Sequence, residues 1–375
     1  MSICCLQCIN MQGSEIITLI QIVNLAKNIK QLSLKFKQTK ENNQYLVKLG
    51  DTLITLNKLE GLCLTIEKDE YLIDDEIRYL IQMVSKLIQL QQLSIDIFGS
   101  ANIQQELLNQ IQQCTKELIN LKKFDYIVQG ENIDTEQACI IGDTLSGLLN
   151  IQDLVLEIHS IQQNQRVTLF CPVQGNLFLG LTGLLSLQLC IKNNKMQADG
   201  YNFIGKSLTR IPNLKKLILE IKSQHHHIQN NFMSDFLSQS HQLQHMELEF
   251  YDQISEQFLD SLADCLSNLQ NINFIKLRIL PTFSSIQSIE KLVNTFHLLK
   301  ELKEISLQIF TQVTKYSIVS SIYSRNQVKK SINQQLINSI KGLPNLLSLT
   351  YRFDGSSFTR SAILIKQSKR LVIYQ

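Results

Sequence analysis

The sequence predicts an α/β solenoid, in which short parallel strands and helices alternate along the chain and stack into one elongated array. Three observations lead to this fold class. One short apolar phrase recurs along the chain at a nearly constant spacing. The second half of the phrase alternates apolar and polar residues, as a half-buried strand does, and the segments between phrases space their apolar residues as helices do.

The repeated phrase has apolar residues at its first, fourth, sixth and eighth positions, as in IKQLSLKF, which begins at Ile29. Further copies begin at Leu59, Leu90, Leu121, Ile151, Leu184, Leu214, Leu243, Ile272, Leu302 and Leu346. Successive copies begin 29 to 33 residues apart, except for the last pair, which is 44 residues apart. This regularity predicts one strand and one helix per interval, and each unit buries its apolar side only against its neighbours.

The segments between the phrases are expected to be helices. Ahead of the third phrase, apolar residues recur at the spacing of one helix face, namely Ile77, Leu80, Ile81, Val84 and Leu87. Asp74 or Asp75 is placed to cap this helix, and Ser14 and Asp143 precede two other apolar runs in the same way.

The phrase resembles the L-x-x-L-x-L signature of leucine-rich-repeat proteins. The repeat length and the true helix resemble the ribonuclease-inhibitor-like subclass, most closely in the segment DGYNFIGKSLTRIPNLKKLILEI from Asp199 to Ile221. The resemblance implies a right-handed solenoid, or horseshoe, of about 11 to 12 repeats, with strands on the concave face and helices on the convex face. One departure is that the family's Asn or Cys after the last signature leucine is replaced, for example by Lys37 and Glu67.

No Pro/Gly/Ser-rich linker divides the chain, so we expect a single leucine-rich-repeat domain over residues 1–375. Within it, residues 1–28 would form a partial N-terminal repeat, 29–310 regular repeats, 311–345 an insertion-bearing repeat and 346–375 the C-terminal repeats. Neither end shows the polar cap that terminal repeats normally carry. We therefore expect the ends to dock on other subunits, or the chain to be a fragment of a longer solenoid.

Composition narrows the class of protein. The net charge of +3 does not resemble the basic footprint of a nucleic-acid binder, so no nucleic-acid partner is expected. The nine cysteines are odd in number and scattered, which favours reduced thiols over a disulfide framework. The sequence shows neither a signal peptide nor an apolar run of about 18 residues, so no membrane partner is expected. These features predict an intracellular, cytoplasmic location, with the nucleus and the cilium left open.

Alternate strand residues are expected to point out of the concave face. The middle outward column is acidic at its centre, where Glu220 and Glu249 lie, and becomes basic where Lys276 and Arg278 lie together. Such a column is either a binding surface or an ordinary solvated face, in which lysines of neighbouring strands neutralise the acids.

The last outward column carries large apolar side chains on three successive strands: Tyr251, Leu280 and Phe310. Adjacent strands lie about 5 Å apart, so these residues would form an apolar strip beside Arg278. Tyr and Arg beside apolar area are typical of interface hot spots, and the alternative is that the rings tuck into the edge of the core. The polar, basic insertion Thr311–Lys330 would lie beside this strip.

No residue set in the sequence predicts catalysis, a cofactor or a metal site. The histidines at 225–227 follow one strand, whereas His241 and His245 precede the next, so the two groups would lie at opposite edges of the sheet and a polar turn is the better interpretation. The single C-x-x-C of Cys5 and Cys8 has no second pair. Phosphate-binding, dinucleotide-binding, hydrolase and kinase motifs are absent from the sequence.

The sequence therefore predicts a non-catalytic scaffold for protein–protein interaction, for example a structural subunit of a larger complex. It does not identify the partner. Two alternatives stay open, an enzyme inhibitor and a regulator of a small GTPase. The second follows from a resemblance to Ran GTPase-activating proteins, which act through a positioned arginine, and Arg166 or Arg210 would be the residue here.

Overall fold

A computed structural model describes residues 5–11, 13–25, 28–37, 39–68, 75–99, 105–130, 135–160, 177–194, 198–223, 232–281, 286–310, 331–354, 361–367 and 370–374. The chain packs as two compact units, unit 1 (Met1–Asn194) and unit 2 (Lys195–Gln375). The single domain over residues 1–375 stays a prediction.

Unit 1 alternates strands and helices along the chain. Its elements are β1 (Cys5–Met11), α1 (Gly13–Leu25), β2 (Gln31–Lys37), α2 (Lys40–Leu53), β3 (Gly61–Lys68), α3 (Asp75–Val84), β4 (Gln92–Gly99), α4 (Gln105–Glu117), β5 (Lys123–Gly130), α5 (Thr135–Ser146), β6 (Asp153–Ser160) and β7 (Ser186–Asn194). The strands lie side by side in chain order, and each neighbouring pair is parallel.

Unit 2 continues the alternation. Its elements are α6 (Ala198–Leu208), β8 (Lys216–Ser223), α7 (Ser234–Gln239), β9 (His245–Ile254), α8 (Glu256–Leu266), β10 (Phe274–Pro281), α9 (Ile286–Thr295), the 3₁₀ helix η1 (Phe296–Leu298), β11 (Glu304–Phe310), a helix at 331–341, β12 (Ser348–Asp354), β13 (Ser361–Gln367) and β14 (Arg370–Tyr374). Neighbouring strands from β8 to β12 are parallel and in chain order.

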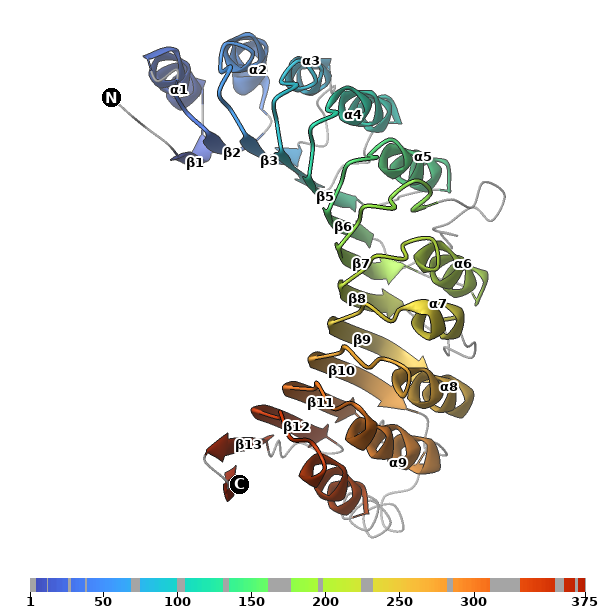
Figure 1. Cartoon of the computed structure of the whole chain (residues 1–375). Coiled ribbons are helices and arrows are strands. Elements are labelled where there is room, and N and C mark those ends of the chain that lie inside the picture. The colour runs from blue at the N-terminus through green and yellow to red at the C-terminus, as the bar shows by residue number, and fades with distance from the viewer. Residues whose placement is uncertain are drawn as a thin grey trace, which may run out of the picture. The chain divides into compact units, whose positions relative to one another are not determined.

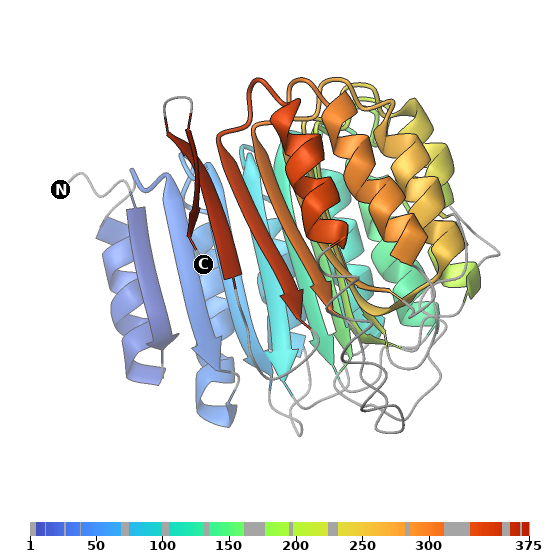
Figure 2. The same ribbon diagram turned by 90° about the horizontal axis from the view of Figure 1, so that it is seen from below.

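Each unit consists of a strand layer and a helix layer that covers one face of it (Figures 1 and 2). The face of the strand layer away from the helices is called the open face below. The apolar phrase positions point toward the helices: Leu32, Leu34 and Phe36 of β2 are buried, whereas Ser33 and Lys35 between them are half-buried on the open face. This arrangement confirms the predicted fold class, an α/β solenoid of the leucine-rich-repeat type.

The helix predicted ahead of the third phrase is α3, and its expected apolar residues Ile77, Leu80, Ile81 and Val84 are all buried, as is Leu87 in the turn that follows. Two of the expected helix caps are wrong. Ser14 lies inside α1, and Asp143 lies in the last turn of α5. The buried face of α5 uses residues earlier than expected, including Ile141, so the helix ends where the sequence had suggested that it begins.

Among the described residues, β12 is the last strand to pair in parallel. β13 pairs antiparallel with β12, and β14 pairs antiparallel with β13, which differs from the expected repeats over residues 346–375. A parallel connection needs a crossover of about a dozen residues or more, whereas only the segment 355–360 joins β12 to β13. The short connection permits only a reversal of direction.

A hydrogen-bond pattern, called the strand-start ladder here, joins successive repeats within each unit just before strands β3 to β7 and β9 to β12. Lys30 O accepts the backbone N–H groups of Glu60 at 2.8 Å and Gly61 at 2.9 Å, and Glu60 O accepts those of Gln91 and Gln92 at 2.8 and 3.0 Å. The same pair of bonds recurs in unit 1 on Gln91 O, Lys122 O and Gln152 O, and in unit 2 on Lys215 O, Gln244 O, Asn273 O and Lys303 O. One carbonyl thus holds two N–H groups of the next repeat.

Side-chain amides reinforce the strand-start ladder. Asn120 Nδ2 donates to Ile88 O at 2.9 Å, and Asn150 Nδ2 donates to Ile119 O at 2.8 Å. Gln89, Asn271 and Asn345 make equivalent bonds to the preceding repeat. Each of these amides lies one residue before a phrase. They donate hydrogen bonds to turn carbonyls near the N-terminal end of each strand. The position where the family usually has Asn or Cys lies at the other, C-terminal end.

Within the described residues, no helix combines the length and the apolar character needed to cross a membrane. Of the described cysteines, Cys63 is half-buried, and Cys114, Cys190 and Cys265 are buried.

Asn120→Ala removes one amide of the strand-start ladder and leaves Ile88 O without that donor. We expect the free energy of unfolding to fall by about 1 kcal/mol, the usual net value of such a bond. Urea unfolding followed by circular dichroism measures this. Gln113→Ala, at an exposed position of α4, is the matched control. An equal loss in both variants would contradict a role for the ladder.

Tyr126→Phe removes a buried hydroxyl that has no hydrogen-bond partner within the described residues, next to the stacked ring of Phe124. Burial also raises the pKa of Tyr126, which shows how poorly its surroundings solvate this group. We expect the free energy of unfolding to rise by about 1 kcal/mol. Tyr79→Phe is the control, since its hydroxyl donates to Asp51 at 2.6 Å, and it should bring no gain.

Candidate functional site

The sequence-predicted surface lies on the open face of β8 to β11 in unit 2. Along β9, β10 and β11 buried and partly exposed residues alternate strictly, so that every second side chain projects from the open face. Because the strands are parallel and nearly in register, these side chains form rows across the sheet. Arg278, for example, lies between Glu249 of β9 and Gln308 of β11.

Arg278 lies against two aromatic rings. Its guanidinium carbon is 4.4 Å from the ring centroid of Tyr251 and 5.0 Å from that of Phe310. Both distances suit cation–π contact, and rings on the two neighbouring strands restrict how far the long arginine side chain can move. The three residues come from β9, β10 and β11, as the outward columns of the sequence predicted, and we call them the Arg278 cluster.

A charged network adjoins the Arg278 cluster. Lys276 Nζ lies 2.5 Å from Glu249 Oε1 and 3.1 Å from Glu247 Oε2, and Arg278 lies 3.9 Å from Glu249 Oε2. Partial burial opposes the charged form of Lys276, but its hydrogen bonds to Glu249 and Glu247 outweigh this and raise the pKa of the lysine. The two bases and two acids therefore neutralise one another.

Glu247 is the most perturbed of these groups. His245 Nε2 lies 2.8 Å from Glu247 Oε1, and this hydrogen bond, together with that from Lys276, outweighs partial burial and lowers the pKa of Glu247 to about 2. The Tyr251 hydroxyl donates to Glu249 Oε2 at 3.2 Å. Burial, followed by the charge of Glu249, raises the pKa of Tyr251, so the tyrosine stays neutral as a donor.

Glu220 of β8 joins the surface from the other side. It lies in register beside Glu249, so two carboxylates are neighbours on adjacent strands, and the charge of Glu220 contributes to the raised pKa of Tyr251. Lys222 Nζ lies 5.8 Å from the ring centroid of Tyr251 and places a positive charge next to this pair.

Leu280 is displaced from the predicted strip. The register between β9 and β10 shifts after Arg278, so that Leu280 pairs with Gln253 and not with Tyr251. Between the pairs Arg278–Glu249 and Leu280–Gln253, the strand β9 has three residues and β10 has one. Arg278, and not Leu280, therefore separates the rings of Tyr251 and Phe310. Tyr251, Leu280 and Phe310 are all half-buried.

His245 and Phe274 belong to this surface, although the sequence suggested only a polar turn for His245. Each is the first residue of its strand, β9 and β10, and their rings stack at 4.2 Å with an interplanar angle of 2°. They form a further outward column, two residues before Glu247 of β9 and Lys276 of β10. Extending the period-two pattern backward by one step would have found them.

Other sequence-predicted features fall elsewhere. The insertion Thr311–Lys330 and Arg166 lie outside the described residues. Arg210 is exposed in the turn after α6, and its backbone N–H bonds to Ser207 O at 3.2 Å. The open face of β8 to β11 therefore holds all seven residues predicted as the binding surface. Their binding role stays a prediction.

Glu247→Gln should destabilise the chain at pH 7 by about 3 kcal/mol, because the folded pKa of about 2 lies below the usual value of 4.5 and each pKa unit corresponds to about 1.4 kcal/mol. The carboxylate stabilises the fold above about pH 4.5, and this contribution disappears as the pH falls toward 2. Urea unfolding of both proteins at several pH values between 7 and 3 should show the difference shrinking. Glu304→Gln, at an exposed position of β11, is the control, and a pH-independent difference for Glu247→Gln would contradict the prediction.

No protein-family model and no curated protein matches the chain. Among solved structures, the chain is similar to a protein from Bacteroides fragilis, with 14% identity and a TM-score of 0.40 over 77% of this chain and 74% of that one. It is also similar to a chain in the complex of Rad7 and Elc1 in yeast, with 14% identity and a TM-score of 0.45 over 90% of this chain and 83% of that one. Likenesses of this size carry no functional argument, and the fold assignment rests on the chain's own strands and helices.

Proposed function

We propose that this chain is a non-catalytic scaffold for protein–protein interaction, acting as a subunit of a larger complex, and that a protein partner binds the open face of unit 2. The observation that carries the proposal is the Arg278 cluster. An arginine held between Tyr251 and Phe310, beside a self-neutralised charge network, presents the residue types that dominate binding energy in protein interfaces.

The cluster also has physical properties that favour binding. Rings on both sides already restrict the Arg278 side chain, so less conformational entropy remains to be lost on association. The guanidinium keeps donors for a partner's carboxylate or carbonyl groups, and the half-buried rings offer apolar area. Lys276 is matched by Glu247 and Glu249, so the partner need not neutralise it.

The competing explanation is that these contacts only stabilise neighbouring strands. The two explanations differ in what a substitution changes. An exposed cation–π pair contributes about 0.5–1 kcal/mol to folding, whereas a residue at the centre of an interface costs about 2 kcal/mol or more of binding energy when it is truncated. Binding and stability therefore have to be measured on the same variants.

The experiment places a photo-crosslinking amino acid at Gln308, which neighbours Arg278 on the open face, in chain expressed in its native cells. A partner crosslinked there is identified by mass spectrometry and purified. The same probe at Leu298, 40% exposed in η1 on the helix side, is the control. The same crosslinks from both positions, or none from Gln308, would contradict the proposed surface.

Arg278→Ala should then weaken binding of the purified partner at least about tenfold, with little change in the urea unfolding midpoint. The double variant Tyr251→Ala with Phe310→Ala should do the same, and Leu298→Ala should leave binding unchanged. Interferometry with immobilised partner gives the affinities. An unchanged affinity of a folded Arg278→Ala protein would exclude this cluster as the binding surface.

A further inference from the structure

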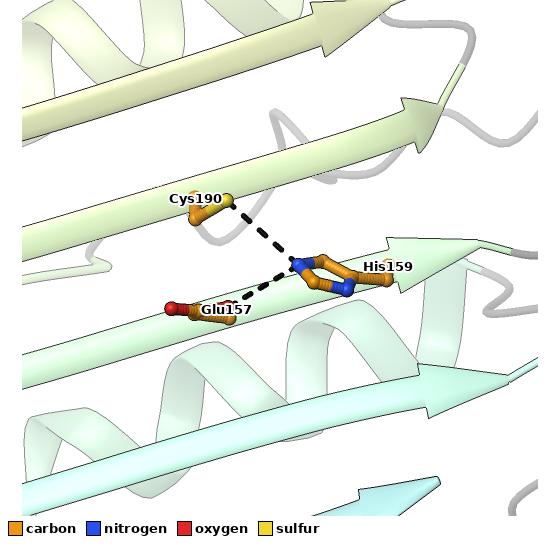
Figure 3. A group of neighbouring side chains, drawn as sticks. All are labelled: Glu157, His159 and Cys190. Carbon is orange, nitrogen blue, oxygen red and sulfur yellow. Dashed lines mark hydrogen bonds and ion pairs between the residues drawn. The ribbon is translucent and has the colours of Figure 1, made fainter. Parts of the chain in front are cut away.

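Three side chains with metal-binding donor atoms meet on the open face of unit 1 (Figure 3). They are Glu157 and His159 of β6 and Cys190 of β7. His159 Nε2 lies 3.3 Å from Glu157 Oε2 and 3.8 Å from Cys190 Sγ, and one donor atom from each residue falls within 4.8 Å of the other two. One nitrogen, one oxygen and one sulfur atom therefore surround a common point.

The strand pattern explains this meeting. Glu157 and His159 are two residues apart on β6, so both project from the open face, and Cys190 is the register partner of Glu157 on β7. The Glu157 and His159 side chains are only 20% and 18% exposed, and Cys190 is buried. The donors are thus held by rigid strands and partly shielded from solvent, and they do not lie on a loop.

The two distances from the histidine nitrogen match a tetrahedral zinc site, and the oxygen and sulfur lie within 4.8 Å of each other. With Zn–N and Zn–O distances of about 2.1 Å and a Zn–S distance of about 2.3 Å, tetrahedral angles place the nitrogen about 3.4 Å from the oxygen and about 3.6 Å from the sulfur. The corresponding distances in the structure are 3.3 and 3.8 Å. An ion at the common point would therefore need only small side-chain adjustments.

The surroundings support a cation. Gln188 Nε2 donates to Glu157 Oε1 at 3.0 Å, which orients the carboxylate and leaves Oε2 facing the histidine. Asp96 and Asp125 lie close enough that the charge of Glu157 helps raise their pKa values, after the larger effect of burial. Three lysines act in the opposite direction: Lys192, the register partner of His159, on Glu157, Lys123 on Asp125, and Lys35 on Asp96.

We propose that Glu157, His159 and Cys190 form a binding site for Zn²⁺, with three protein ligands and a fourth position open to water. On binding, the Cys190 thiol releases its proton to solvent and the thiolate sulfur bonds to the metal. The neutral His159 ring contributes the Nε2 lone pair, and its remaining proton sits on Nδ1. Glu157 contributes one carboxylate oxygen.

The alternative is a metal-free cluster in which His159 shares hydrogen bonds with the carboxylate and the thiol. Zinc and hydrogen bonding use the same lone pairs, so the two explanations predict opposite results when metal is supplied. Because the chain has other cysteines, including Cys5 and Cys8, the informative quantity is the difference between the wild type and variants of this site.

The test titrates Zn²⁺ into the full chain in competition with a chromophoric chelator. The wild type should bind one more equivalent than Cys190→Ser, with a dissociation constant on the order of 1 µM or tighter. Loss of a direct ligand should exceed the 10- to 100-fold cost of disturbing an outer-sphere partner, so Cys190→Ser and Glu157→Gln should each weaken this site by about 100-fold or more. Cys63→Ser, a half-buried cysteine on the open face of β3, is the matched control and should bind as the wild type does.

Cobalt gives a second readout that does not depend on affinity. The wild type loaded with Co²⁺ should show a thiolate-to-cobalt charge-transfer band that is weaker in Cys190→Ser and unchanged in Cys63→Ser. Circular dichroism checks that each variant is folded, and Glu157→Gln provides a test if Cys190→Ser is not. Equal zinc binding by the wild type and the folded variants, or an equal loss in Cys63→Ser, would overturn the site.

Discussion

Within each unit, successive repeats are joined just before strands β3 to β7 and β9 to β12 by one carbonyl oxygen that accepts two backbone N–H groups of the next repeat. This strand-start ladder sets the register, because it fixes where each strand begins relative to the one before it. The register in turn decides which side chains become neighbours on the open face, since a slip of one residue would turn every side chain to the other face. Both clusters described above depend on it.

The fold could be predicted because the signal is local and repeated. Alternation in the phrase identifies strands, and the spacing of residues such as Ile77 and Val84 identifies a helix face that is buried as expected. The strand β13 has no such signal, because Ser361–Gln367 does not carry the repeated phrase. Without the start of this strand, the short connection from β12 could not be counted, and the reversal that it imposes was not foreseen.

The surfaces could be predicted only as far as register can be counted along the chain. Arg278, Tyr251 and Phe310 come together as expected. The irregular register after Arg278 places Leu280 beside Gln253, and no residue type in the sequence predicts that shift. Glu157, His159 and Cys190 occupy outward positions of β6 and β7. A search by spacing along the sequence misses them, because Cys190 is distant in the chain and reaches the others only across two strands.

The rungs of the strand-start ladder occupy only the few residues before each strand, and this has a consequence for how such a chain can change over evolution. Leu347 N bonds to Lys303 O at 2.7 Å although the interval is 44 residues, just as Lys303 N bonds to Asn273 O at 2.8 Å across an ordinary interval. The segments between these bonds can therefore lengthen, shorten or change in sequence, while the hydrogen bonds on either side keep the same geometry.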